Sequence, residues 1–381
     1  MSAEPTKLDA INQIQKEINT FYRKEGKLKH DVLYPASQIK IDFISTGSLA
    51  LDRALGGGFA RGRSVELLGE LSTLKTSFAM QGIANAQEAG MVCAFYDVEG
   101  TFDGRRAELL GVELEELQMI ERALRGDEAL DVVCSLLDQG NFFVVIDSVA
   151  ALLPKEEAVR RLGEDTVGRQ ASLMSRAMRK ITQANRDGCV VFINQLRENI
   201  GITFGPRTKG PGGKALGFYA THRVRFTRIE TLKSKRTIYV NGKPEEKDVE
   251  TAWRIQAKIE KSKVGRPLRE AVFLFDLDTG MVDNLEELLN LSLEYGLIKP
   301  DGPQHFVVVA TGERVRWRQG ILNVIENDPD QFYNELVQLI NAAPAKEPTQ
   351  PPDDQAAPEP PEDPLAAVRA LLPNLSLPAQ P

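Results

Sequence analysis

One short stretch of the chain has the residue types of a phosphate-binding loop. In such a loop, backbone N–H groups and a helix N-terminus face the phosphates, a lysine reaches the β/γ oxygens and a Ser/Thr hydroxyl holds Mg²⁺. The usual pattern G-x-x-x-x-G-K-[ST] has a glycine before the lysine, where this chain has a leucine. Taken alone, the imperfect match could arise by chance. The stretch consists of Gly69, Glu70, Leu71, Ser72, Thr73, Leu74, Lys75 and Thr76.

Polar side chains follow three other apolar runs. Asp147 ends one run, Glu99 lies just beyond a second, and Asn194-Gln195 end a third. The carboxyl ends of parallel strands meet at one edge of a sheet, where open α/β folds bind ligands. Asp147 is placed to orient Mg²⁺, although it could instead only cap the following turn. Glu99 could polarise a water that attacks the γ-phosphate.

A long loop rich in glycine and basic residues follows Gln195. Residues 197–217 contain six glycines and one acid, Glu198. Such a loop is too flexible for a core and is suited to wrapping nucleic-acid phosphates. A purely structural role does not explain the exposed aliphatic Ile200. A second loop, residues 156–168, mixes bases with acids and is a weaker signal. The bases of the first loop are Arg197, Arg207, Lys209 and Lys214.

Composition excludes several classes of protein. At roughly 150 residues per domain, the 381 residues allow one large domain and one or two small ones. No run approaches the ~20 apolar residues of a membrane helix, and the polar start is not a signal peptide, so we expect a cytoplasmic protein with no membrane partner. The net charge of −7 excludes a polycation and makes any nucleic-acid surface local. Scattered histidines argue against a His-based metal site, and Cys93, Cys134 and Cys189 are expected to be buried thiols.

The elements that must position these groups alternate between strands and helices. This alternation predicts βαβ units and an α/β fold with a mostly parallel sheet covered on both faces. Two edge strands are expected at 254–258 and 271–275. The other expected strands are 64–68, 92–96, 142–146, 189–193 and 221–228, and the helices are 76–89, 127–137 and 173–185.

The two ends of the chain differ from the middle. Apolar residues at helical spacing, from Leu8 to Phe21 or Tyr22, predict an N-terminal helix that ends near Gly26. Its apolar stripe could pack on its own domain or on a neighbouring subunit. After residue 283 we expect a small α+β module with helices 285–295 and 332–340 around a hairpin of 306–310 and 314–316.

The last 38 residues, 344–381, carry eleven prolines and a charge of −4, which predicts a disordered acidic tail. A short helix at 365–372 leaves two roles open, a solubilising tail or a docking motif for a protein partner. The predicted organisation is an oligomerisation helix in 1–35, a core in 36–280, the α+β module in 281–343 and the tail in 344–381.

Several blocks of the chain resemble bacterial RecA recombinases. The likeness covers roughly residues 8–340, and the substituted glycine and divergent tail are more similar to a phage-type than to a cellular member. The blocks that carry it are Ile44-Ser45-Thr46-Gly47-Ser48-Leu49 with Leu51-Asp52, residues 93–99, 145–152, 178–180, 192–195, 212–216 and 218–220.

This resemblance implies a RecA-like P-loop ATPase core with Mg²⁺ and ATP, in a recombinase that forms helical filaments on single-stranded DNA and exchanges strands with duplex DNA. By matching position, Glu99 activates water, Thr76 and Asp147 hold magnesium, and Gln195 senses the γ-phosphate. Asp103 meets the adenine amino group, and Arg106 takes the place of an adenine-stacking tyrosine. Lys261 and Lys263 reach the neighbouring subunit's ATP, although from the residues alone they read as a solvated basic edge. For DNA, Val167 and Ile200 match base-wedging positions and Arg179, Gly212 and Gly213 match phosphate contacts, with Arg169 on the same helix.

Two other readings remain open. A non-catalytic paralogue or recombination mediator would bind DNA and a partner recombinase without efficient ATP turnover. A RecA-fold motor such as a ring helicase is disfavoured by the continuous recombinase-like blocks. We expect Leu74 to adopt ordinary helical backbone angles, with its side chain turned away from the phosphates, so that the protein binds and hydrolyses ATP.

Overall fold

The computed structural model describes residues 7–24, 31–154, 168–198, 208–209, 212–240, 243–265, 267 and 269–342. The chain forms two units, Met1–Asp42 and Phe43–Pro381. The predicted acidic tail at 344–381 lies outside the described residues. Among the described residues, no helix is long and apolar enough to cross a membrane.

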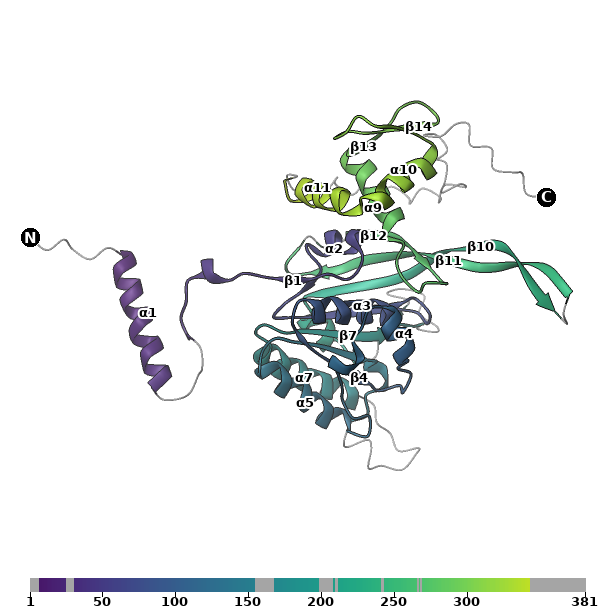
Figure 1. Ribbon diagram of the computed structural model, residues 1–381. Helices are drawn as coiled ribbons and strands as arrows, with labels where there is room; N and C mark the ends of the chain where they lie inside the picture. Colours follow the sequence, from purple (N-terminus) through teal and green to yellow (C-terminus); the bar gives the residue numbers. More distant parts are fainter. Residues whose placement is uncertain are drawn as a thin grey trace, which may run out of the picture. The chain divides into compact units, whose positions relative to one another are not determined.

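An eight-stranded, mostly parallel sheet forms the centre of the second unit, in the order β12-β11-β10-β3-β7-β6-β4-β5 (Figure 1). Strands β10, β3, β7, β6, β4 and β5 pair in parallel, whereas β11 and β12 are antiparallel additions at one edge. This confirms the predicted fold class. The strands are β3 Arg63–Gly69, β4 Val92–Asp97, β5 Leu117–Met119, β6 Phe142–Asp147, β7 Cys189–Gln195, β10 His222–Val240, β11 Lys243–Ser262 and β12 Glu270–Asp276.

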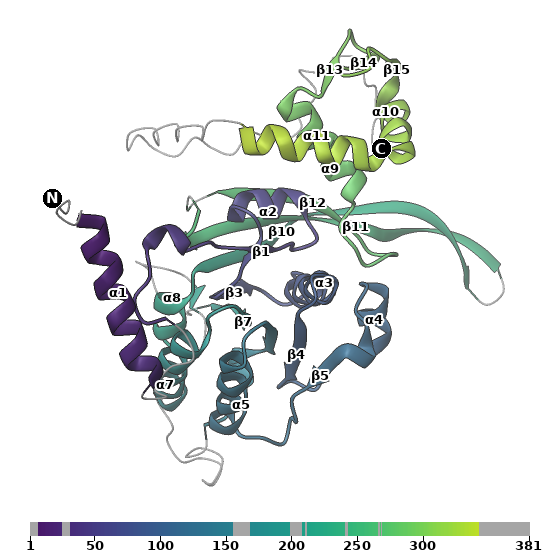
Figure 2. The same cartoon turned by 60° about the vertical axis from the view of Figure 1, so that its left-hand side comes forward.

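Helices cover both faces of this sheet, because its central strands are apolar on both sides. In β6, Phe143 and Val145 pack into the cluster under α3, whereas Val144 and Ile146 pack against α5 and α7 (Figure 2). Burial of each such side chain stabilises the fold by about 1.5–3 kcal/mol. The helices are α2 Leu49–Leu55, α3 Lys75–Glu88, α4 Gly104–Leu109, α5 Gly126–Asp138, α7 Arg169–Ala184 and α8 Ala215–Tyr219, with 3-10 turns at Leu114–Glu116 and Val149–Ala151. Two short ladders pair β1 Phe43–Ile44 with β2 Phe59–Ala60 and β8 Arg197–Glu198 with β9 Thr208–Lys209.

The strands predicted at 221–228 and 254–258 are much longer than expected. They are parts of β10 and β11, which span 19 and 20 residues and form a hairpin that extends well beyond the sheet (Figures 1 and 2). Residues 233–237 and 244–250 are mostly charged or polar and, apart from Val249, exposed, so they lack the apolar alternation that marks a strand. The sequence feature that could have predicted this hairpin is Asn241-Gly242, a dipeptide typical of two-residue hairpin turns.

The C-terminal module contains more elements than the sequence predicted. The expected hairpin is part of a three-stranded sheet, and α10 was missed because no capping side chain marks its start at Trp317, where φ is +64°. Residues such as Leu289, Ile298 and Ile321 form its core. The elements are α9 Asn284–Tyr295, β13 Ile298–Pro300, β14 His305–Val308, β15 Arg314–Arg316, α10 Trp317–Asn327 and α11 Pro329–Ala342.

The first unit contains the predicted N-terminal helix, α1 Lys7–Lys24, followed by a 3-10 turn at Ala36–Gln38. Asn19 ties the segment after the helix back to it, because its amide nitrogen donates to Leu33 O at 2.8 Å and its oxygen accepts from the N–H groups of Val32 and Leu33. Within this unit Leu8, Ile11, Ile14 and Phe21 are exposed. Cys93 and Cys189 are buried as expected, whereas Cys134 is half-buried.

Candidate nucleotide-binding site and DNA interface

The predicted phosphate-binding loop, residues 69–76, lies between β3 and α3, the strand–loop–helix context that the sequence indicated. Lys75 is buried and its Nζ donates to Gly69 O at 3.1 Å, to Glu70 O at 2.5 Å and to Thr73 Oγ1 at 3.2 Å. Thr73 Oγ1 in turn donates to Glu70 O at 2.9 Å. Burial lowers the pKa of Lys75, while the nearby carboxylates of Asp147, Glu99 and Glu70 oppose that shift. The loop therefore holds a cation where phosphates would meet the N-terminus of α3.

Leu74 does not adopt the helical conformation that we expected. Its φ and ψ are +68° and +13°, in the left-handed region, and Ser72 also has a positive φ of +56°. The loop must reverse direction between β3 and α3, and this reversal requires the left-handed conformation that a glycine normally provides. The Leu74 side chain packs against the buried cluster that includes Phe78. Apolar packing therefore offsets part of a backbone cost of about 1–2 kcal/mol.

Thr76 and Asp147 come together at the base of the loop. Thr76 Oγ1 donates to Asp147 Oδ2 at 2.7 Å, and Asp147 is 5% exposed. Burial raises the pKa of Asp147 to about 6, against the effects of the Thr76 hydrogen bond and of the Lys75 charge. A hydroxyl and a carboxylate are hard oxygen donors of the kind that Mg²⁺ prefers. The two residues therefore fit a magnesium ion bound with nucleotide phosphates.

Glu99 is connected to two other strand ends. Its Oε1 accepts from Ser148 Oγ at 2.5 Å and from Gln195 Nε2 at 2.7 Å. The other acids that follow β4 are occupied locally: Asp97 accepts the N–H groups of three following residues, and Asp103 caps α4. Ser148, which follows a cis peptide bond after Asp147, was not singled out from the sequence. The geometry thus links Glu99 to Gln195, at the start of the basic loop.

The two residues assigned to adenine lie on α4 and its cap. Asp103 accepts the N–H groups of Arg105 and Arg106. Arg106 Nη2 donates to Ser77 Oγ on α3 at 3.0 Å. The arginine therefore lies beside the helix that begins with Lys75, while the adenine contacts themselves stay predictions.

Lys261 and Lys263 lie toward the amino ends of the parallel strands, whereas the predicted phosphate-binding loop follows the carboxyl end of β3. Ser262 pairs with His222, which is beside Val65, whereas the loop begins beside Phe226. Lys261 Nζ donates to Gly217 O at 2.6 Å and to Phe218 O at 2.7 Å, and Lys263 Nζ donates to Tyr219 O at 3.2 Å. The sheet thus separates both lysines from the loop of their own chain.

Part of the predicted DNA surface assembles around α7. Arg169 begins this helix, and Arg179 is exposed on it. Gly212 and Gly213 have φ of +86° and +76°, and a Cβ on Gly213 would lie 2.7 Å from Ala171 Cβ. This close approach requires glycine and places the end of the basic loop, with exposed Lys214, against α7. Arg197 pairs with Lys209 across β8–β9, while Val167, Ile200 and Arg207 lie outside the described residues.

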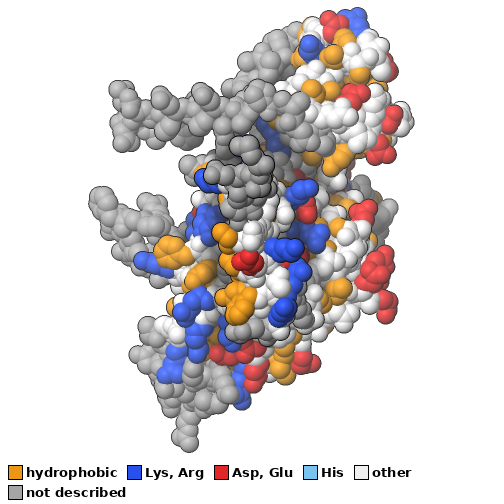
Figure 3. All heavy atoms as spheres, turned by 90° about the vertical axis from the view of Figure 1, so that its left-hand side faces the viewer, with side chains coloured by type: hydrophobic (Ala, Val, Ile, Leu, Met, Phe, Trp, Pro, Cys, Tyr) orange, Lys and Arg blue, Asp and Glu red, His pale blue; other side chains and the backbone are white. Residues whose placement is uncertain are grey.

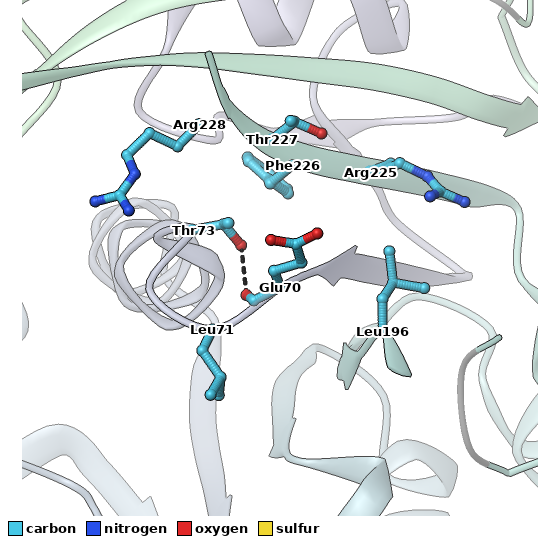
Figure 4. Close-up of a pocket in the computed structure, with 8 residues that line it drawn as sticks. All are labelled: Glu70, Leu71, Thr73, Leu196, Arg225, Phe226, Thr227 and Arg228. Carbon is cyan, nitrogen blue, oxygen red and sulfur yellow. Dashed lines mark hydrogen bonds between the residues drawn. The ribbon is translucent and has the colours of Figure 1, made fainter. Parts of the chain in front are cut away.

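A cavity of about 150 Å³ lies between the loop and β10. Figure 4 shows the Glu70 carboxylate pointing into it from the loop. On its wall, Arg225 Nε donates to Glu260 Oε1 at 2.5 Å. The guanidinium carbon of Arg228 lies over the Trp253 ring, 4.7 Å from the ring centroid. Thr76, Asp147 and Glu99 are not part of its lining, and the sequence did not indicate these arginines. The lining consists of Glu70, Leu71, Thr73, Leu196, Arg225, Phe226, Thr227 and Arg228.

Positive charge is local on this acidic chain. In the view of Figure 3, lysine and arginine side chains gather in several surface patches, and most of the acidic side chains in view lie in other patches. With a net charge of −7, only such local surfaces can attract phosphates.

Comparison with known proteins agrees with this arrangement. Residues 9–282 match the family model of the RecA N-terminal domain. The chain is 36% identical over 327 residues to Protein RecA of Acidothermus cellulolyticus, covering 84% of this chain and 90% of that protein. It is 39% identical to Protein RecA of Trichormus variabilis, with coverage of 85% and 86%, and 39% identical to that of Mycobacterium ulcerans, with coverage of 79% and 84%. The family-model match over residues 9–282 and these identities over most of the chain show that the protein belongs to the RecA family.

Proposed function

We propose that this protein is an ATP-dependent recombinase that forms filaments on single-stranded DNA and promotes strand exchange with duplex DNA. The observation that carries the proposal is that Glu99 binds both Ser148, which follows the Asp147 of the Thr76–Asp147 pair, and Gln195. One sheet edge thereby joins a candidate nucleotide site to the end of the strand that leads into the basic loop. A DNA-dependent ATPase requires such a connection.

In this proposal the loop residues bind the nucleotide. Lys75 exchanges its contacts with Gly69 O and Glu70 O for phosphate oxygens, which repay the cost of burying its charge. Thr76 and Asp147 hold Mg²⁺, which neutralises phosphate charge when bound. Asp147 binds it as the ionised carboxylate.

Hydrolysis is assigned to Glu99. As the water oxygen attacks the γ-phosphorus and the bond to the ADP oxygen breaks, Glu99 accepts the water's proton. Ser148 and Gln195 orient the carboxylate through its Oε1. Because Gln195 ends β7 and a single residue separates it from Arg197, a change in its hydrogen bonds alters the start of the DNA-binding loop.

The next subunit completes the nucleotide-binding site. Lys261 and Lys263 lie at the opposite end of the sheet from their own loop, so in a head-to-tail assembly they meet the neighbour's phosphates. A repeated head-to-tail contact that does not close builds a helical filament. Binding of ATP between subunits then couples assembly to the DNA-binding loops.

A non-catalytic paralogue is the second candidate, and Leu74 is the observation that favours it. A leucine in the left-handed conformation replaces the glycine that phosphate loops normally carry there. If its side chain hindered the phosphates, the protein would bind DNA or a partner recombinase without turning over ATP.

The deciding experiment measures ATP hydrolysis with and without single-stranded DNA, followed by electron microscopy for filaments and a strand-exchange assay. Stimulation by DNA that Lys75→Ala abolishes, together with filaments and exchange, supports the recombinase. Nucleotide binding without turnover in wild type, or no nucleotide binding at all, favours the paralogue.

A further inference from the structure

The outer part of the β10–β11 hairpin projects beyond the body of the second unit (Figures 1 and 2). We call residues 233–237 of β10 and 244–250 of β11 the outer ribbon. The parallel pairing of β10 with β3 ends at Phe226, and the pairing of β11 with β12 spans Ala252 to Lys258 of β11. Among the described strands, the outer ribbon has therefore no neighbour on either edge.

Nothing in its own packing explains this length. From 233 to 237 every residue is exposed, and from 244 to 250 only Val249 is partly covered. A two-stranded ribbon without an apolar face is marginally stable at best, and open edges are a liability that proteins usually cover. One contact to the body comes from Arg236, within the ribbon, whose guanidinium contacts the Asp278 carboxylate through two hydrogen bonds. The ribbon is thus fixed to the body and presented to solvent.

The charges are sorted by strand. The β10 part carries three bases, Lys233, Lys235 and Arg236, and no acid. The β11 part carries four acids and a single base, Lys247. Lys233 lies opposite Glu250, Lys235 opposite Asp248 and Thr237 opposite Glu246. Since side chains alternate along a strand, these residues share one face, with a basic row beside an acidic row.

We propose that the outer ribbon is a contact surface for a second copy of this chain, in which the basic row of one copy lies beside the acidic row of the next. The inference rests on the filament of the proposed function and adds a contact to it. When two ribbons lie edge to edge, a two-fold symmetric contact would place like rows side by side, which is repulsive. In this arrangement a head-to-tail contact matches opposite charges, and it repeats from copy to copy as a filament requires.

The same charges disfavour DNA as the occupant. Over 233–250 the bases Lys233, Lys235, Arg236, Lys243 and Lys247 are balanced by Glu245, Glu246, Asp248 and Glu250, a net of +1. Phosphates bind through an excess of Lys and Arg, and here the acidic row lies directly beside the basic one. A partner with both signs of charge fits this face better than a polyanion does.

The test uses two charge variants of the full chain. Lys233→Glu with Lys235→Glu makes both rows acidic, and Glu246→Lys with Asp248→Lys leaves both rows with a net positive charge, although Glu250 remains in the second. The protein concentration that half-covers poly(dT) with filaments is measured for each variant, for their equal mixture, and for the four-fold variant that exchanges the rows within one chain. The far-UV circular dichroism spectrum and the Tm of each variant serve as the control for folding.

Each variant alone should need at least about tenfold more protein than wild type, because like charges would meet at every junction. The equal mixture should form filaments at a protein concentration close to that of wild type, since acidic and basic copies can alternate. The four-fold variant should also need about the same concentration as wild type. A defect inside the ribbon or in folding cannot be repaired by mixing, so recovery supports the contact between copies.

The inference is overturned if the mixture half-covers poly(dT) only at a concentration between those that the two variants need alone. Tighter binding by the basic variant and weaker binding by the acidic one, without recovery on mixing, would assign the ribbon to DNA. Wild-type behaviour of both variants alone would leave filament formation intact and remove the ribbon contact. If wild type itself forms no filaments, the proposed function fails first.

Discussion

At the scale of single residues, Glu99 is the acid whose surroundings fit a catalytic base. Glu99→Gln should lower turnover by about 10²-fold or more while nucleotide binding survives, because the amide cannot accept the water's proton. Steady-state ATPase rates and binding of a fluorescent ATP analogue check this. Glu108→Gln, on the exposed side of α4, is the matched control. Unchanged turnover in Glu99→Gln would move the catalytic role elsewhere.

Leu74 allows a second test, because glycine and alanine respond differently to its backbone angles. Leu74→Gly relieves the left-handed strain and loses only a partly buried side chain, so its free energy of unfolding should stay within about 1 kcal/mol of wild type. Leu74→Ala keeps the strain, loses the packing and should be less stable than Leu74→Gly. Urea unfolding of both variants measures this order.

The reverse order at residue 74 would indicate an ordinary helical conformation, in which alanine is more stable than glycine by about 1 kcal/mol. Turnover should change only modestly in Leu74→Gly, whereas Lys75→Ala should abolish ATP binding and hydrolysis. If wild type binds no nucleotide and Leu74→Gly restores binding, the non-catalytic paralogue is the correct reading.

Asp147 predicts a dependence of stability on pH. Burial raises its pKa from 3.8 to about 6, so between these values the folded protein binds more protons than the unfolded chain. Stability is therefore lost as the pH rises through this window. Asp147→Asn removes the free-energy cost of ionising the buried carboxyl, which is at most about 3 kcal/mol. The Tm of the variant relative to that of wild type should therefore rise as the pH increases from 4 to 7. A pH-independent difference between the two proteins would contradict the buried carboxylate.

At the scale of elements, we expect the bases of the basic loop to attract DNA phosphates and the uncharged Ile200 side chain to wedge between bases. Arg207→Ala with Lys209→Ala should weaken binding of all single-stranded sequences alike and reduce the salt slope of binding by about one to two. Ile200→Ala should weaken binding without changing the slope. Fluorescence anisotropy over a salt series measures both, and a sequence-specific loss from either change would contradict a general strand-binding role.

At the scale of the whole molecule, the tail and the core carry different charges. Residues 344–381 account for −4 of the net −7, and such a segment tethered near a basic surface competes with DNA phosphates at low salt. Deletion of 344–381 should speed DNA loading, most visibly onto duplex DNA, and the gain should shrink as salt rises. Stopped-flow loading assays measure this. Equal rates at low salt would leave the tail as a solubilising or docking segment.

The sequence by itself determined the parts of this protein that depend on local pattern. The apolar runs that end at Asp147 and Gln195 predicted strands, and strands alternating with helices predicted a parallel sheet whose carboxyl edge holds the polar groups. The order Lys75-Thr76 after a strand predicted a phosphate-binding loop, and the structure has a strand and a helix on either side of it. The strand and helix predictions hold because the apolar periodicity on which they rest is a local property.

The tertiary structure decided what depends on contacts between distant residues. Only packing against the buried cluster shows why Leu74 can adopt a left-handed conformation, and only the meeting of three strand ends links Ser148 and Gln195 to Glu99. The opposite placement of Lys261 and the length of the β10–β11 hairpin also come from strand pairing. Exposed charged strands carry no hydrophobic period, so their partners follow from pairing across the fold and not from the local sequence.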